Sequence, residues 1–248
     1  MNPPETASPA TASALRGPGT GASGAAWQLR CDKATRFFGA FPVLRGVTFQ
    51  LPAHRMIALF GHNGAGKSTL LNILAGALKP SSGTVLIGGH AVRSAAARRQ
   101  TGLLSHQSLL HPTLTVQENL EFFATLYDVA DRAGAARAAL ARVRGEHLAN
   151  LRAGELSQGM KQKAALARCL LHTPQLLLLD EPFASLDRAT VAEMRRCFAE
   201  LRDQGLTLLL STHTDELITD LCDGSLTMER GKLVAAEGVE AMLSEAAR

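Results

Sequence analysis

Short apolar runs, each ended by polar or turn-forming residues, are the clearest pattern along this chain. They are MIALF at 56–60, QLLLLD at 175–180 and LTLLLST at 206–212, with GLLSHQ at 102–107 as a weaker fourth. Continuous apolar runs of this length are typical of strands that are buried on both faces of a parallel sheet. Stretches with helical spacing separate the runs, so we expect an α/β core with a mainly parallel central sheet.

Other segments predict antiparallel strands around this core. The strand-like stretches are 27–39, 43–61, the short run TVLIGG at 84–89, and a hairpin over 223–234 that turns at Arg230 and Gly231. We expect the antiparallel material at the start of the domain, and the helical stretch in its middle, to be additions to the parallel sheet.

Helices are predicted where apolar residues recur three or four positions apart. Leu70, Leu71 and Ile73 give this spacing in a helix over 66–78. Thr115 and Glu118 form a capping box that opens a helix over 115–127. Three further helices are expected over 131–151, over 190–201 and, as a short element, at the end of the chain.

Composition adds few restrictions to this picture. The chain has 248 residues, 46% of them hydrophobic and 19% charged, which is ample for one good-sized core. Its formal net charge of +4 is compatible with phosphates, nucleic acid or an anionic membrane face, and does not select among them. The four cysteines, at 31, 169, 197 and 222, have no paired spacing, so we expect reduced, buried thiols.

The first 26 residues differ from the rest in composition. They are rich in Pro, Ala, Gly, Ser and Thr and lack the apolar segment of a secretory signal, so a disordered tail is expected over 1–26. The folded domain is expected over 27–248. No run approaches the ~18 apolar residues that are needed to cross a bilayer.

The stretch GHNGAGKST matches the phosphate-binding pattern G-x-x-x-x-G-K-[ST], with a strand before it and a helix after it. Glycines allow the backbone N–H groups to converge on phosphates, Lys67 bridges the β- and γ-phosphates, and the Ser68 hydroxyl holds Mg²⁺. The helix N-terminus adds partial positive charge. The predicted nucleotide-binding residues here are Gly61, His62, Asn63, Gly64, Ala65, Gly66, Lys67, Ser68 and Thr69.

Polar residues at the ends of the other predicted strands complete a hydrolytic site. Asp180 ends one buried strand, where it is expected to hold Mg²⁺, and Glu181 follows it as the base for an attacking water. His213 follows another strand and is expected near the γ-phosphate. Gln107 follows a third and is expected to reach Mg²⁺ or water. Taken alone, His213 fits an ordinary structural histidine better than a catalytic one, and Gln107 fits an ordinary loop glutamine better than a ligand.

These motifs, in their order and spacing, resemble the ATP-binding subunit of ABC transporters from residue 27 to about 233. The set also includes LSQGM at 156–160 and SLD at 185–187. The resemblance implies a P-loop NTPase core of the ABC type, with an antiparallel β subdomain and a small helical subdomain over about 108–172. It implies that Phe38 stacks on adenine, and that Asp187 lies in a loop crossing between two sites. It also supports catalytic roles for Glu181, His213 and Gln107, and magnesium ligation by Ser68, Asp180 and Gln107.

The signature motif of the family, usually LSGGQ, contacts the γ-phosphate of a nucleotide held by a second subunit. Here it comprises Leu156, Ser157, Gln158, Gly159 and Met160. Gln158 and Met160 depart from the usual residues, whereas Ser157 and Gly159 are kept. The departures look like the signature of haem-exporter ATPases from cytochrome c maturation systems, as does the stretch 98–129.

The resemblance implies ATP and Mg²⁺ as cofactors, an integral membrane permease as partner and a second ATP-binding subunit. It places the protein peripherally at the cytoplasmic face of the inner membrane. ATPases of drug, lipid or polysaccharide exporters stay open as alternatives, because they share most of these motifs. A soluble ATPase acting on nucleic acid is less favoured, because only about 90 residues separate Lys67 from Ser157 and leave no room for a coiled-coil arm. A small-molecule kinase leaves the signature and Gln107 unexplained.

Overall fold

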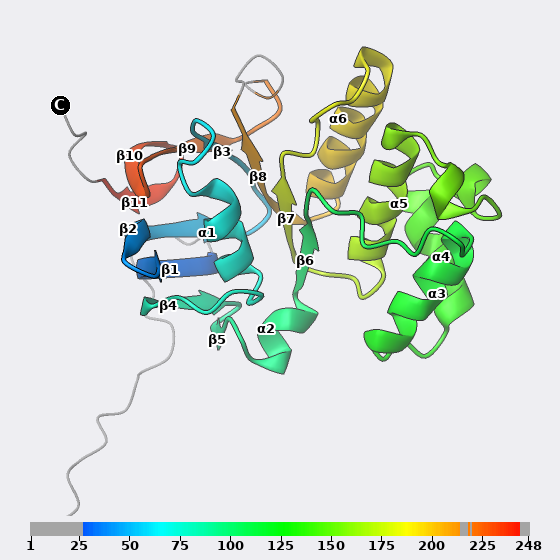
Figure 1. Ribbon diagram of the computed structural model, residues 1–248, viewed down its shortest axis with the longest axis horizontal. Helices are drawn as coiled ribbons and strands as arrows, with labels where there is room; N and C mark the ends of the chain where they lie inside the picture. Colours follow the sequence, from blue (N-terminus) through cyan, green and yellow to red (C-terminus); the bar gives the residue numbers. More distant parts are fainter. Residues whose placement is uncertain (1–26, 214–217, 219, 244–248) are drawn as a thin grey trace, which may run out of the picture.

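The computed structural model describes residues 27–213, 218 and 220–243. Two sheets organise this part of the chain (Figure 1). The N-terminal tail expected over 1–26 lies outside the described residues.

The larger sheet has six strands in the order β10-β9-β3-β8-β7-β6. Neighbouring strands from β9 to β6 are parallel, and only β10 pairs antiparallel with β9. This confirms the mainly parallel sheet. The strands are β3 (Met56–Phe60), β6 (Thr101–Leu104), β7 (Leu176–Asp180), β8 (Thr207–Thr212), β9 (Gly224–Glu229) and β10 (Lys232–Glu237).

Strands β7 and β8 are buried along their whole length because both faces of the sheet are covered. Leu177 and Leu208 belong to one hydrophobic cluster, which also contains the buried side chains of α3 to α6. Leu178 and Leu209 belong to a second cluster, which contains α1 and the antiparallel sheet. Successive side chains of each strand therefore point alternately into the two hydrophobic clusters. Because both faces of the strand are buried, its segment in the sequence is continuously apolar.

The smaller sheet is antiparallel and has the strand order β11-β2-β1-β4-β5. Its strands are β1 (Trp27–Phe38), β2 (Phe41–Pro52), β4 (Ser82–Ile87), β5 (His90–Ala91) and β11 (Glu240–Met242). The prediction of a helix at the end of the chain is wrong for Glu240–Met242, which form β11. There, Glu240–Met242 pairs with Thr48–Gln50 of β2, and the backbone bonds of a strand replace those of a helix. Residues 244–248 lie outside the described part.

Helices lie on both faces of the parallel sheet (Figure 1). Helix α1 packs on one face, between the two sheets, and helices α3 to α6 pack on the opposite face. The helices are α1 (Lys67–Leu74), α2 (Ala95–Arg99), α3 (Val116–Leu126), α4 (Arg132–Arg142), α5 (Gln158–Leu170) and α6 (Arg188–Asp203), with 3-10 turns at Glu146–Leu148 and Ala153–Glu155. The capping box of Thr115 and Glu118 is confirmed at the start of α3. No helix in the described ranges is both long and apolar enough to span a membrane. The boundaries of a separate helical subdomain over about 108–172 stay a prediction.

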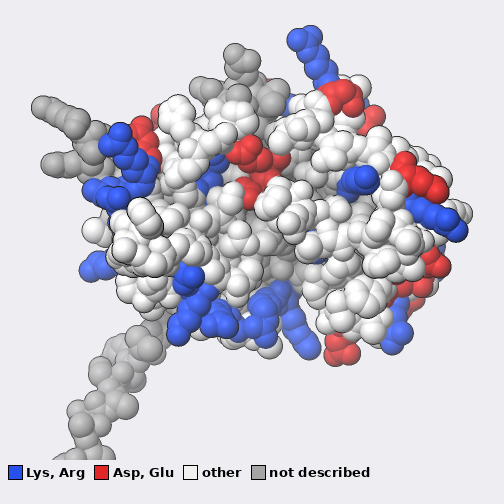
Figure 2. All heavy atoms as spheres, viewed as in Figure 1, with Lys and Arg blue, Asp and Glu red and all other residues white. Residues whose placement is uncertain are grey.

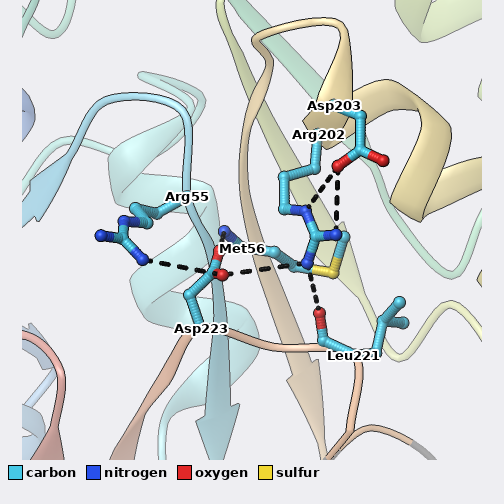
Figure 3. Close-up of polar contacts among 6 residues, drawn as sticks. All are labelled: Arg55, Met56, Arg202, Asp203, Leu221 and Asp223. Carbon is cyan, nitrogen blue, oxygen red and sulfur yellow. Dashed lines mark hydrogen bonds and ion pairs between the residues drawn. The ribbon is translucent and has the colours of Figure 1, made fainter.

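Asp223 holds together the end of the parallel sheet at which its strands begin (Figure 3). One carboxylate oxygen accepts a hydrogen bond from the Met56 N–H at 2.8 Å, at the start of β3. The other lies 3.7 Å from Arg55 and 3.8 Å from Arg202 of α6, and the Arg202 guanidinium also donates to the Leu221 carbonyl. These contacts tie β3, α6 and the approach to β9 together at the end of the strands opposite to the predicted phosphate loop.

Candidate nucleotide-hydrolysis site

The predicted phosphate loop connects β3 to α1 and turns through glycines with positive φ angles. Gly61 has φ 153°, and a Cβ atom there would lie 2.6 Å from the carbonyl oxygen of Met228. Gly66 has φ 104° and begins α1 as its N-cap, where a Cβ atom would lie 3.1 Å from the Val43 carbonyl oxygen. Because a side chain fits at neither position, the backbone takes a path that only glycine allows.

The loop presents its central residues to solvent and anchors its ends. His62, Asn63 and Gly64 are exposed, Ala65 and Gly66 are buried, and Ser68 is exposed in the first turn of α1, followed by the half-buried Thr69. The first N–H groups of α1 have no partners within the helix, so they and the loop amides suit an anion. All nine residues predicted for phosphate binding thus lie in one loop and helix start.

Lys67 lies at the centre of the charged part of the site. Its side chain is only 5% exposed, and its ammonium donates to the carbonyls of Gly61 at 2.6 Å and His62 at 3.4 Å. It also lies 3.4 Å from a carboxylate oxygen of Glu181. A buried ammonium needs several oxygen partners, and the oxygens of a bound phosphate would be equivalent partners for it.

Asp180 and Glu181 stand at the end of β7 and are both held by Ser211 of β8. The Ser211 hydroxyl donates to Asp180 at 2.7 Å and accepts from the Glu181 N–H at 2.9 Å. Asp180 is 5% exposed and Ser211 is fully buried. One serine therefore sets the orientation of the predicted magnesium carboxylate and of the backbone that carries the predicted base.

Glu181 joins the two other predicted groups. Its second carboxylate oxygen lies 3.1 Å from Nδ1 of His213, while Lys67 contacts the first. His213 is half exposed, and the Glu181–His213 region lines a hollow of about 190 Å³. A carboxylate at a solvent-accessible hollow, oriented by a cation and an imidazole, is suited to accept a proton from water.

The donor set fits a magnesium ion that is shared with phosphates. Ser68 offers an exposed hydroxyl and Asp180 a carboxylate, and both are oxygen ligands. Among the described residues, no cluster of three or more His, Cys, Asp or Glu side chains is arranged to bind a metal. Mg²⁺ takes one or two carboxylates from a protein and completes its shell with phosphate oxygens and water.

No hydrogen bond within the described part of the chain joins Gln107 to this group of residues, and its predicted role stays a prediction. It is exposed in the loop after β6, and its backbone carbonyl accepts a hydrogen bond from the Ser105 hydroxyl at 2.9 Å. Within the described part of the chain its side chain has no recorded contact with Lys67 or Glu181. The strand expected over 102–107 ends at Leu104, so Gln107 lies in the loop three residues beyond β6, and a loop does not fix the direction of a side chain.

Phe38 lies at the tip of the β1–β2 hairpin, and Val43 and Leu44 of the same hairpin lie against Gly66 of the phosphate loop. The Phe38 ring is 47% exposed, and the guanidinium of Arg36 lies 4.6 Å from its centre. An exposed aromatic ring on a hairpin that contacts the loop has the character needed to stack on a base.

The signature residues open α5. Leu156 is buried, Ser157 is the N-cap, and its hydroxyl accepts a hydrogen bond from the Met160 N–H at 3.3 Å. Gln158 is exposed, whereas Met160 is half buried and packs against the core. Because α5 and α1 pack in the clusters on opposite faces of the parallel sheet, the structure does not bring Ser157 to the phosphate loop of the same chain.

Two residues that sequence reasoning did not assign belong to the site. Ser211 was recognised only as the end of an apolar run, and Gln162 was part of a polar helix start. Gln162 donates to the Pro182 carbonyl at 3.1 Å, next to Glu181. Neither contact has a local sequence signal, because the partners are 31 and 20 residues away.

Known proteins match most of the chain. Three relatives are the linearmycin resistance ATP-binding protein of Bacillus subtilis, the Nod factor export ATP-binding protein I of Burkholderia lata, and the sulfate/thiosulfate import ATP-binding protein of Salmonella typhi. They are 29%, 35% and 36% identical, over 84%, 83% and 85% of this chain. The chain spans 68%, 69% and 60% of their respective lengths.

Solved structures give the same result. The cbiO1 protein of Clostridium perfringens, part of the ABC transporter complex cbiONQ, has a TM-score of 0.77 and 27% identity, covering 86% of this chain and 88% of that one. An ATP-binding subunit of an ABC transporter has a TM-score of 0.75 and 29% identity, covering 84% and 89%. The family model described as ABC transporter matches residues 44–184. With this match and the hydrolytic site, the chain belongs to the ABC transporter family as an ATP-binding, ATP-hydrolysing unit.

Proposed function

We propose that this chain is the ATP-hydrolysing motor subunit of an ABC exporter and that Glu181 is its catalytic base. The observation that carries the proposal is the joint contact of Glu181 with Lys67 and His213. In this role Glu181 takes a proton from the attacking water, and His213 orients the carboxylate and the water. Lys67 and the loop amides hold the phosphates, and Phe38 stacks on the base.

Bound Mg²⁺ would neutralise negative charge on the phosphates. Ser68 and Asp180 would hold it, and Ser211 would keep the Asp180 carboxylate in place through the hydrogen bond described above. Gln107 would reach the metal or the water only after its loop reorients.

A second ATP-binding subunit is the proposed partner of the signature residues. Ser157 is an exposed helix N-cap on the far side of the sheet from the chain's own phosphate loop. A helix start of this kind suits a phosphate oxygen. We therefore place Leu156–Met160 against the nucleotide of the partner, and an integral membrane permease at the cytoplasmic face of the inner membrane as the element that the pair drives.

The catalytic assignment is tested with Glu181→Gln, which keeps the shape of the side chain and removes its basicity. We expect turnover to fall by at least about 100-fold, with ATP affinity retained and an ATP-bound dimer accumulating. Glu237→Gln on the exposed part of β10 is the matched control and should turn over normally. Near wild-type turnover of the Glu181 variant would show that another group is the base.

For the cargo, we propose haem export in cytochrome c maturation. The support is the resemblance of the loop Ser105-His106-Gln107, with Leu110, and of the signature LSQGMKQ to haem-exporter ATPases. Deleting the gene should abolish covalent haem attachment to c-type cytochromes, and the wild-type gene should restore it, whereas the Glu181→Gln gene should not. Normal holocytochrome in the deletion strain would reject the haem branch and favour an exporter of drugs, lipids or polysaccharides.

A nucleic-acid ATPase is not the function that we propose. Lys and Arg side chains gather along the lower edge of the face in Figure 2. Among the exposed arginines of the α2 region, Arg98 donates to the Arg93 carbonyl, and Arg99 lies 3.9 Å from Asp128.

Affinity purification from membranes should recover a polytopic subunit with the full-length chain. Recovery only with nucleic acid would contradict the exporter.

A further inference from the structure

The first two turns of α5 contact the loop that carries Glu181. The Gln162 side-chain amide donates to the carbonyl of Pro182 at 3.1 Å. Gln162 is half buried and Pro182 is buried, so water competes weakly for this carbonyl. The signature helix therefore reaches, within one chain, the residue that follows the proposed base.

The backbone of Glu181 needs such support. Its φ angle is 48°, a left-handed conformation that is uncommon for a residue with a side chain. Conformations of this kind cost about 1–3 kcal/mol and persist where surrounding contacts determine them. Here the Glu181 N–H donates to Ser211, its carbonyl accepts from the Ala184 N–H at 3.1 Å, and the next carbonyl accepts from Gln162.

Two more contacts join the start of α5 to the start of α6. Lys163 forms an ion pair with Glu193, which lowers the pKa of the Glu193 carboxyl through the hydrogen bond and charge of Lys163. Gly159 packs so closely on Thr190 that an added Cβ would lie 2.7 Å from its methyl carbon. Thr190 is in turn held by Asp187, the N-cap of α6. The loop between Glu181 and α6 is thus fixed to α5 at both of its ends.

We infer that Gln162 is a positioning residue for Glu181, and that it links the signature helix to the base of the same chain. Without its donor, the Pro182 peptide can rotate, and the adjacent left-handed residue loses one of the three bonds that fix the direction of its carboxylate. The inference rests on the proposed role of Glu181, and it adds a path by which phosphate contact at Ser157 affects hydrolysis in its own subunit.

The test compares two substitutions in the full-length chain. Gln162→Met keeps the length of the side chain and removes the donor, and Gln162→Glu keeps its shape and removes the donor when ionised. Both should lower kcat about 10-fold, with KM for ATP and the Kd of ATP within twofold of wild type. The matched control is Gln175→Met, an exposed glutamine at the opposite end of β7, which should leave kcat unchanged.

A second measurement separates positioning from folding. In a Glu181→Gln background, adding Gln162→Met should cause no further loss of the residual turnover, because the group that it positions is absent. A kcat within twofold of wild type in both Gln162 variants would overturn the inference. A parallel fall of kcat, ATP affinity and melting temperature would also overturn it, as the sign of a structural role. Normal turnover of Glu181→Gln alone would instead refute the base assignment.

Discussion

Ser211→Ala is the substitution that most directly tests how the acidic end of β7 is held. The Ser211 hydroxyl is fully buried and has two partners, the Asp180 carboxylate at 2.7 Å and the Glu181 N–H at 2.9 Å. Alanine fits the same space without strain, since only the hydroxyl oxygen is removed. The change therefore isolates the two hydrogen bonds from packing.

The expected loss follows from the charge and burial of the partners. A hydrogen bond to a charged group contributes about 1.5–3 kcal/mol, and leaving a buried N–H without a partner costs about 1 kcal/mol or more. Since Asp180 is only 5% exposed, water does not readily replace the lost donor. We expect the free energy of unfolding to fall by about 3 kcal/mol, which is roughly 6–12 °C in melting temperature for a chain of this size.

Urea denaturation followed by circular dichroism gives the free energy, with calorimetry as the second measurement. The control is Ser225→Ala in β9, which removes a half-buried hydroxyl that has no hydrogen-bond partner among the described residues and should change stability by less than about 0.5 kcal/mol. A loss below about 1 kcal/mol, or one equal to that of the control, would refute the reasoning that Ser211 holds Asp180 and Glu181.

Three further changes give distinct expectations. Gly159→Ala should destabilise the protein by about 1 kcal/mol in urea denaturation because of the close approach to Thr190. The added change Thr190→Ser, which removes the methyl carbon, should recover part of this loss, since the hydroxyl oxygen would still lie 3.0 Å from the added Cβ. Phe38→Ala should raise the Kd of ATP about 10-fold without changing that of inorganic triphosphate, whereas Phe41→Ala should change neither. Burial lowers the pKa of His172 below its usual 6.5, so the unfolded chain binds a proton there that the folded chain does not, and stability should decrease as pH falls below about 6.5. In His172→Gln, the dependence of unfolding free energy on pH over this range should be weaker, and an unchanged slope would contradict the burial argument.

The strands of the parallel sheet were predictable because a strand that is buried on both faces has a short, continuously apolar sequence. Met56–Phe60 matches β3 residue for residue, and the runs at 175–180 and 206–212 differ from β7 and β8 by one residue at the start. Both faces of these strands are covered, so their central positions are continuously apolar and show no alternation.

The end of the chain shows where this approach stops. Glu240–Met242 is three residues long, with one half-buried side chain, and it forms a strand only because β2 offers its edge. A pairing between residues almost 200 positions apart leaves no periodicity to detect. The helix predicted over 66–78 is too long, because α1 ends at Leu74. Gly76 has a φ of 72°, a left-handed conformation that does not continue the helix.

The site divides in the same way. The phosphate loop was predictable because one continuous stretch supplies both the turn and the helix start. The roles of Ser211 and Gln162 arise only when distant segments meet, and ordinary serine or glutamine positions give no signal for them. Gln107 illustrates the third case, in which the strand was expected to continue to residue 107 but ends at Leu104, and Gln107 lies in the exposed loop that follows.

These contacts also bear on why hydrolysis needs two subunits in our proposal. The parallel sheet separates α1 from α5, so no small movement of the chain brings Ser157 to its own phosphate loop. Yet α5 contacts the Glu181 loop through Gln162 and the start of α6 through Lys163. In our proposal the phosphate that contacts Ser157 belongs to the partner, while the carboxylate that responds belongs to the same chain as that Ser157. Each nucleotide would then align the base acting on the other, and hydrolysis at one site would depend on occupancy of both.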